Sequence, residues 1–252
     1  MGWSLRLHGV GNASAVELGS AMATIERDGA PWLTIDCGAE GLTACEAHYG
    51  HPPHALFMTH AHMDHIAGFE RLFVSSWFDR ERRGETRLYA PVTLLPLLHQ
   101  RLASYPNALA EGGVNFWDAF RVVPVGDHFW HDGVRVEVFP TRHHWPDTSF
   151  GLRLVRSLVW TGDTRPIPEQ LAKYAGAGEL VAHDCALHGN PSHSGIEDLE
   201  REYPRELLDR CLLYHYASRE EGEALAARGY RVARPGEAVA LAEPLASPEL
   251  PT

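Results

Sequence analysis

The segment LFMTHAHMDHIAGF, at 56–69, places three histidines and an aspartate within six residues, between two apolar runs. The apolar run ALFM ends as a buried strand would, so that His60 and His62 lie at its mouth, and Asp64 and His65 open the following helix. Zinc binds imidazole nitrogens and carboxylate oxygens at about 2.0–2.2 Å, so its ligands must converge from several chain segments. One loop cannot close such a site, and further ligands must come from elsewhere in the chain.

Three later segments have the same design, an apolar strand that ends in a residue able to bind a metal. They are VEVFPTRHH, which ends at His143 and His144, LVWTGD, which ends at Asp163, and LLYH, which ends at His215. In open α/β sheets, functional groups collect beyond the strand ends. Gly162 would also let the backbone approach the metals closely. The sequence therefore predicts one metal centre assembled from separate strand ends.

Short strand-like runs alternate with helical patterns along the chain, which is typical of an α/β protein. The strand-like runs cover 22–28, 31–38, 134–140, 150–155, 157–163, 179–184 and 211–216. One helix, in SREEGEALAARG, begins with a capping box from Ser218 to Glu221 and ends at Gly229.

The length of 252 residues and the apolar content of 44% fit one enzyme-sized domain that spans 1–252. The region from about 70 to 130 is rich in aromatic residues and interrupts the strand pattern. We expect it to be an irregular insertion near the pocket. Residues 244–252 are expected to form a frayed tail.

Charge and cysteine content restrict the partners and the compartment. Lys and Arg number 22 against 33 Asp and Glu, and the net charge of −11 opposes any sequence-independent grip on a phosphate backbone. Long nucleic acids are therefore disfavoured as partners. The four cysteines form no CxxC pair and the N-terminus has no signal-peptide pattern, so we expect a cytoplasmic protein. No apolar run approaches the roughly 18–20 residues that cross a bilayer, so no membrane association is expected.

The block from His60 to His65, followed by His143, Asp163 in TGDT and His215 in LYHYAS, resembles the five metal-binding motifs of the metallo-β-lactamase-fold hydrolases, in family order. LTIDCG also resembles the strand that ends in Asp-x-Gly in those proteins. The resemblance implies a four-layer αββα sandwich, two zinc ions with manganese as the alternative, and a homodimer as in many relatives. It also implies how the ligands divide: His60, His62 and His143 on one ion, Asp64, His65 and His215 on the other, with Asp163 bridging.

The remaining histidines are less suitable as metal ligands. In relatives the third-motif ligand is commonly followed at the third position by proline, and Pro146 gives that register to His143, with His144 as the second choice. Other histidines are expected to be solvated loop residues, namely His48, His51, His54, His128 and His131.

A second motif narrows the reaction. LVAHDCALHGNPSHSGIEDL places Asp184 at a strand end and His193 nine residues later, in a loop that opens a helix. This arrangement resembles ribonuclease Z and related phosphodiesterases. The resemblance implies that His193 steadies the phosphoryl oxygens or protonates the leaving group, while Asp184 fixes its tautomer and keeps it protonated near neutral pH. The alternative is a surface histidine in a polar loop.

Two metal ions lower the pKa of a bridging water and hold the attacking and leaving oxygens of an in-line displacement. In such a site we expect Asp64 to be both a metal ligand and a catalytic residue. Only a tight turn around Arg156 stands where several bacterial ribonuclease Z enzymes insert a tRNA-gripping arm. The sequence also lacks the N-terminal cysteine cluster of the similar phosphodiesterase of phosphonate breakdown. We therefore expect a metal-dependent hydrolase of a small or cyclic phosphodiester, such as a cyclic nucleotide.

Three alternatives remain open at this point. The same metals suit hydrolysis of a carboxylic ester or lactone, although His193 then has no obvious task. A tRNA 3′-processing ribonuclease Z-like nuclease is the second alternative. The third is a protein that only binds or senses a ligand, which loss of metal ligands would favour, and none is lost.

Overall fold

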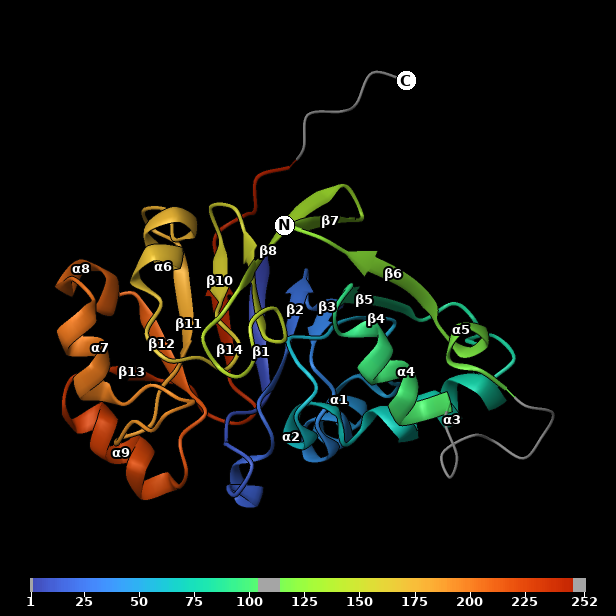
Figure 1. The fold of residues 1–252 in the computed structure, drawn as a ribbon, viewed down its shortest axis with the longest axis horizontal. Coiled ribbons are helices and arrows are strands. Elements are labelled where there is room, and N and C mark those ends of the chain that lie inside the picture. The colour runs from blue at the N-terminus through green and yellow to red at the C-terminus, as the bar shows by residue number, and fades with distance from the viewer. Residues whose placement is uncertain (1, 104–113, 247–252) are drawn as a thin grey trace.

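The computed structural model describes residues 2–103 and 114–246. Within them the chain forms two seven-stranded sheets with helices on both outer sides (Figure 1). The helices of the N-terminal half cover one sheet and those of the C-terminal half cover the other. The four-layer αββα sandwich and the α/β class expected from the sequence are confirmed.

The first sheet has the strand order β14-β1-β2-β3-β4-β5-β6. Its strands β3 to β6 are parallel to one another, whereas β2 pairs antiparallel with β3, and β1 pairs antiparallel with both β2 and β14. The first sheet therefore joins the two ends of the described chain. Its strands are β1 (Trp3–Gly9), β2 (Met22–Arg27), β3 (Ala30–Ile35), β4 (Ala55–Phe57), β5 (Arg87–Pro91), β6 (Arg121–Val125) and β14 (Ala238–Leu241).

The second sheet has the strand order β13-β12-β11-β10-β9-β8-β7. Its strands β10, β11 and β12 are parallel and carry near-continuous apolar runs, as strands buried on both faces do. Its strands are β7 (His128–His131), β8 (Val134–Pro140), β9 (Phe150–Leu154), β10 (Leu158–Trp160), β11 (Leu180–Asp184), β12 (Cys211–Tyr214) and β13 (Arg231–Val232).

The helices connect the parallel strands. The Ser218 side chain caps α9 by accepting a hydrogen bond from Glu221 N, as the capping box predicts. No helix among the described residues is long and apolar enough to cross a membrane. The helices are α1 (Ala39–Tyr49), α2 (Met63–Ile66), α3 (Phe69–Phe78), α4 (Leu95–Ala103), α5 (Phe116–Ala119), α6 (Pro168–Tyr174), α7 (Ile196–Glu202), α8 (Arg205–Leu208) and α9 (Arg219–Ala227), with a short 3-10 turn η1 (Val16–Leu18).

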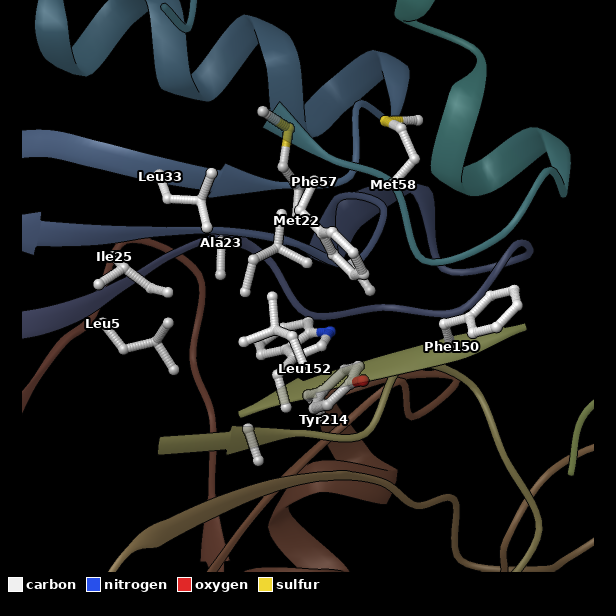
Figure 2. Close-up of a cluster of buried hydrophobic side chains, with 14 of the residues drawn as sticks. Leu5, Met22, Ala23, Ile25, Leu33, Phe57, Met58, Phe150, Leu152 and Tyr214 are labelled. Carbon is white, nitrogen blue, oxygen red and sulfur yellow. The ribbon is translucent and has the colours of Figure 1, made fainter. Parts of the chain in front are cut away.

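Apolar side chains from both sheets meet in the core between them. Figure 2 shows Leu5, Ile25 and Phe57 of the first sheet facing Leu152 and Tyr214 of the second. All five are essentially excluded from solvent. The packing of these inner faces fixes the position of one sheet on the other, and with it the position of the strand ends that carry the candidate ligands.

The region from about 70 to 130 is more regular than the sequence pattern predicted. Residues 104–113 lie outside the described residues, but the rest contains α3, α4 and α5 together with β5 and β6, which extend the first sheet. Its aromatic residues are largely core side chains: Phe69 stacks on Phe120 with ring centroids 5.1 Å apart. The prediction of an irregular insertion was therefore wrong. Pro124 lies in β6, at the edge of the first sheet. Proline argues against a central strand and is tolerated at sheet edges, so its presence obscured the strand pattern of this segment in the sequence.

Two smaller expectations also change. Of the predicted tail at 244–252, residues 247–252 lie outside the described residues, but Leu245 N donates to Val155 O at 2.9 Å and Ala246 bridges to Val134. His131 is buried rather than solvated, since its Nε2 lies 2.7 Å from Trp32 O and its Nδ1 lies 2.9 Å from the Tyr89 hydroxyl.

A pair of adjacent leucines on α4 tests whether this region belongs to the core. Leu98 is fully buried, whereas Leu97 is 44% exposed. Leu98→Ala should lower the free energy of unfolding by about 2–5 kcal/mol, and Leu97→Ala should change it by less than about 0.5 kcal/mol. Chemical denaturation of both variants measures the difference. Equal, small effects would mean that α4 does not pack on the core.

Candidate metal centre

The strand ends deliver the predicted ligands to one place. His60 and His62 follow β4, and Asp64 and His65 lie in α2. The other three follow β8, β10 and β12, so the site draws on both sheets. Four overlapping groups have ligand atoms within 4.8 Å of one another. Two contain the predicted ligands alone, His60 with His62 and His143, and Asp64 with His65, Asp163 and His215, and the other two include His193.

Asp163 lies between the two groups. Its Oδ2 atom is 3.1 Å from the Nε2 atoms of both His65 and His215. The same oxygen lies 3.6 Å from His60 Nε2 and 3.8 Å from His143 Nε2. Gly162 adopts a φ of 64°, and a Cβ there would lie 2.8 Å from Phe150 O, so the turn that aims Asp163 requires glycine.

The outer nitrogens of the histidines are held by neighbours, which turns the inner nitrogens toward the centre. His60 Nδ1 lies 3.0 Å from Thr59 Oγ1, and His143 Nδ1 donates to Ser192 O at 2.9 Å. His65 Nδ1 lies 2.8 Å from Asp36 Oδ2. Such partners fix the ring orientation and tautomer of metal-binding histidines.

Electrostatics divide the cluster into two halves. Burial lowers the pKa values of His60, His62 and His143, so these imidazoles are neutral, as metal ligation requires. Burial also opposes the charged form of His65 and His215, but carboxylates beside each hold the pKa values of both well above the usual range. Asp163 contributes most to that increase in each case.

Several features show that these residues fit a divalent metal. His60 Nε2 and Asp163 Oδ1 are buried and have no hydrogen-bond partner among the described residues. His143 Nε2 lies 2.8 Å from His62 Nδ1, a close approach of two nitrogens that a shared cation would satisfy. The donors are imidazole nitrogens and carboxylate oxygens, the set that zinc and similar ions prefer.

His143 and His144 occupy different environments. His143 is 5% exposed and lies within the cluster, whereas His144 is exposed beside it. The rings of His144 and His62 are 5.3 Å apart in an edge contact. The structure therefore brings His143 into the cluster and leaves His144 on its rim.

The second predicted motif lies against the same cluster. His193 Nδ1 is 2.8 Å from Asp184 Oδ2, and its ring centroid is 4.6 Å from that of His143 and 4.7 Å from that of His215. Asp184 is fully buried, which opposes its ionisation, but His215 and His193 hold its pKa below the usual value. His193 is therefore not an isolated surface histidine.

The cluster opens into a reaction cavity of about 240 Å³. Its lining includes His62, Asp64, Asp163, His193 and His215. Sequence reasoning missed the part of its wall formed by Asn12, Ala13, Ser14, Ala186 and Asn190. The signal for the first three was the pair Gly9 and Gly11, which lets the loop after β1 pack closely against Ser20 and Ala15.

The fold and the cluster together define a metal-dependent hydrolase of the metallo-β-lactamase fold. A family profile described as Anti-Pycsar protein Apyc1 matches residues 3–239. The chain is 31% identical over 226 residues to the Anti-Pycsar protein Apyc1 of Saccharibacillus brassicae, covering 86% of this chain and 91% of the relative. The chain therefore belongs to the Anti-Pycsar protein Apyc1 family.

Two further comparisons agree with this class. Ribonuclease Z of Mycobacterium sp. (strain KMS) is 28% identical over 216 residues, covering 80% of this chain and 72% of the relative. The crystal structure of a diphosphatase from the PhnP family has the same fold, with a TM-score of 0.75 at 16% identity, covering 97% of this chain and all of the other. The comparisons support the expected activity, metal-dependent phosphodiester hydrolysis.

The adjacent histidines provide a matched test of the ligand set. Loss of a residue that only hydrogen-bonds a metal ligand typically raises the dissociation constant for the metal roughly 10–100-fold. His143→Ala removes a ligand itself, so it should raise that constant by more. His144→Ala should leave it nearly unchanged, because that side chain lies on the rim. Metal titration of both variants after complete chelation gives the two constants. Loss of binding in His144→Ala alone would reverse the assignment.

Proposed function

We propose that this chain hydrolyses a small cyclic phosphodiester, foremost a cyclic nucleotide, at a centre that holds two divalent metals. The observation that carries the proposal is the position of His193, held by Asp184 at the edge of the metal cluster and inside the same cavity. The two groups of ligands would bind the metals of such a site. A histidine beside them can donate the proton that a poor leaving group, such as an alkoxide, requires in order to depart.

The ligand assignment follows the two groups of side chains. One ion would be held by His60, His62 and His143, and the other by Asp64, His65 and His215, with Asp163 shared because its Oδ2 faces both sets. We propose zinc, since imidazole nitrogens dominate, with manganese as the alternative. When bound, the metals supply positive charge for the phosphoryl oxygens and lower the pKa of a water molecule.

The protein's own groups complete the reaction. The carboxylate of Asp64 lines the cavity and can accept a hydrogen bond from the attacking water. His193 Nδ1–H donates a hydrogen bond to Asp184 Oδ2, so its Nε2 atom remains for the substrate. In its protonated form, His193 donates from Nε2 to a phosphoryl oxygen or to the departing alkoxide. Asp184 also accepts from Thr164 N at 2.8 Å, which fixes the carboxylate.

Cavity size and charge support a small substrate. The reaction cavity holds about 240 Å³, and the chain carries a net charge of −11, which disfavours a long phosphate backbone. Strands β9 and β10 are joined by a tight turn in which Arg156 has a φ of 72°. A tRNA-processing activity stays the alternative that the ribonuclease Z relatives suggest.

We also propose a cytoplasmic homodimer. All four cysteines are buried free thiols, which suits a reducing compartment. Phe78 on α3 and Trp117 on α5 are 54% and 52% exposed, and large exposed apolar side chains favour association. Light scattering coupled to gel filtration decides the oligomeric state, and a monomer at micromolar concentration would contradict it.

Metal stoichiometry tests the shared role of Asp163. Fully loaded wild-type protein should hold two ions per chain, and Asp163→Ala should weaken both, because its carboxylate faces both ligand groups. Asp209→Ala, which removes a surface carboxylate paired with Arg205, is the control and should retain two ions. Elemental analysis after equilibrium dialysis gives the counts. A single ion that survives Asp163→Ala would contradict two shared sites.

Leaving-group dependence tests the role of His193. His193→Ala should lose about 10²–10⁴-fold in kcat on a cyclic nucleotide, whose alkoxide departs poorly, and much less on bis-nitrophenyl phosphate, whose phenolate needs no proton. Asp184→Asn should show the same order with a smaller loss. His188→Ala, an exposed histidine of the same loop, is the control and should behave as wild type.

The outcomes separate the remaining roles, provided that metal content is equal in all variants. Equal losses on both substrates would mean that His193 only positions or polarises the phosphate. An enzyme that hydrolyses lactones efficiently and is indifferent to His193→Ala would be a carboxylic ester or lactone hydrolase instead.

A further inference from the structure

A second cavity adjoins the reaction cavity and plays no part in the chemistry described so far. It has a volume of about 210 Å³ and shares Asn12, Ala13 and Asp64 with the reaction cavity. A larger cavity of about 620 Å³ lies beyond His143 and His144 but shares no lining residue with the reaction cavity. The smaller of these two shares part of its wall with the reaction cavity, whereas the larger one borders the centre only at the candidate ligand His143.

The walls of this second cavity are mainly small or flexible apolar side chains. Ala13, Ala15 and Val16 come from the loop after β1, and Met63 and Ala67 come from α2 and the residue after it. Val16 is 68% exposed and Met63 is 51% exposed. Apolar side chains exposed around a concave surface mark a ligand site, and the methionine thioether packs well against aromatic rings.

The loop wall is preformed. Val10 N donates to Leu18 O at 3.1 Å and Gly11 N donates to Gly19 O at 2.8 Å, which closes the loop on itself. His215 N donates to Val10 O at 2.6 Å and so ties the loop to a candidate metal ligand. The second cavity therefore keeps a fixed position relative to the cluster, and a ligand need not order the loop on binding.

Charge decides what this cavity can accept. Its charged lining residues are Glu40 and Asp64, and Ser20 Oγ donates to Glu40 Oε2 at 2.9 Å. Asp64 is also a candidate metal ligand, so Glu40 is the carboxylate that remains to repel a further phosphate group, and Arg101 Nη2 lies beside the wall at Met63, 2.8 Å from Met63 Sδ. Beside Glu40 the cavity therefore favours an uncharged part of the substrate.

We propose that this second cavity is a base subsite, which holds the nucleobase of a cyclic mononucleotide while its phosphodiester lies in the reaction cavity. The inference rests on the proposed function. Met63 and Val16 would pack on the flat face of the base, a contact that tolerates different bases because each has such a face. Glu40 would disfavour substrates that carry a second phosphate, such as dinucleotides.

Filling the cavity tests the subsite. Ala67 is exposed, so Ala67→Trp can occupy the base subsite without overpacking the core. The variant should raise KM for a 3′,5′-cyclic mononucleotide about 10-fold or more. On methyl 4-nitrophenyl phosphate, which has no base, its kcat/KM should stay within about twofold of wild type. The matched control is Gln170→Trp in the larger cavity, which should affect neither substrate.

Three other results would contradict the base subsite, provided that the wild type and both variants have the same metal content. Equal losses on both substrates would show that the tryptophan obstructs the reaction cavity itself. A KM increase in Gln170→Trp but not in Ala67→Trp would place the base in the larger cavity. A wild-type enzyme that hydrolyses neither diester would overturn the proposed function, and the subsite with it.

A charge variant provides an independent readout. At low ionic strength, Glu40→Gln should raise kcat/KM for a linear dinucleotide about two- to fivefold and change that for the cyclic mononucleotide little, because an exposed carboxylate repels only the extra phosphate. High salt should remove the difference, since it screens exposed charges. Unchanged discrimination at low salt would overturn the role of Glu40.

Discussion

The buried carboxylate of Asp36 organises the segment that carries four of the candidate ligands. It accepts hydrogen bonds from Thr59 N at 2.8 Å and from the Thr59 hydroxyl, and it lies 2.8 Å from His65 Nδ1. Backbone bonds reinforce the arrangement, because Asp36 N donates to Phe57 O and Cys37 N donates to His65 O. Asp36 adopts a left-handed φ of 63°, a costly conformation for a residue other than glycine, and these bonds hold it there. One side chain thus sets the geometry between the end of β3, the end of β4 and α2.

Most of the metal site could be predicted from the sequence, because its ligands follow a local rule. A buried strand needs an apolar run, and whatever follows that run lies at the edge of the sheet. This rule identifies His60, Asp163 and His215 without any knowledge of how the strands pair. Asp184 and His193 required a resemblance, since their spacing alone does not show that the loop folds back on the cluster. In the structure it does so through Ser194 N, which donates to Thr164 O at 3.0 Å.

Features that depend on distant pairing were not predictable. β1 and β14 went unrecognised as partners because their contact joins the two ends of the described chain. His131 was expected in solvent because its sequence neighbourhood is polar, and only the approach of Trp32 and Tyr89 from the first sheet buries it. Asp36 belonged to a recognised motif, but its bond to His65 spans 29 positions. The wall at Asn12 and Ala13 contains no metal-binding or titratable side chain, so its residue types did not mark it as part of the site.

The pairing of β1 with β14 has a consequence for biosynthesis. Trp3 pairs with Leu241, so β1 leaves the ribosome long before β14 and has no partner on that edge until β14 has been made. His60 to His65 emerge early, but the segment that ends at His215 arrives much later. We infer that the nascent chain exposes an open sheet edge until β14 has been made and an incomplete ligand set until His215 has been made, a state prone to wrong association.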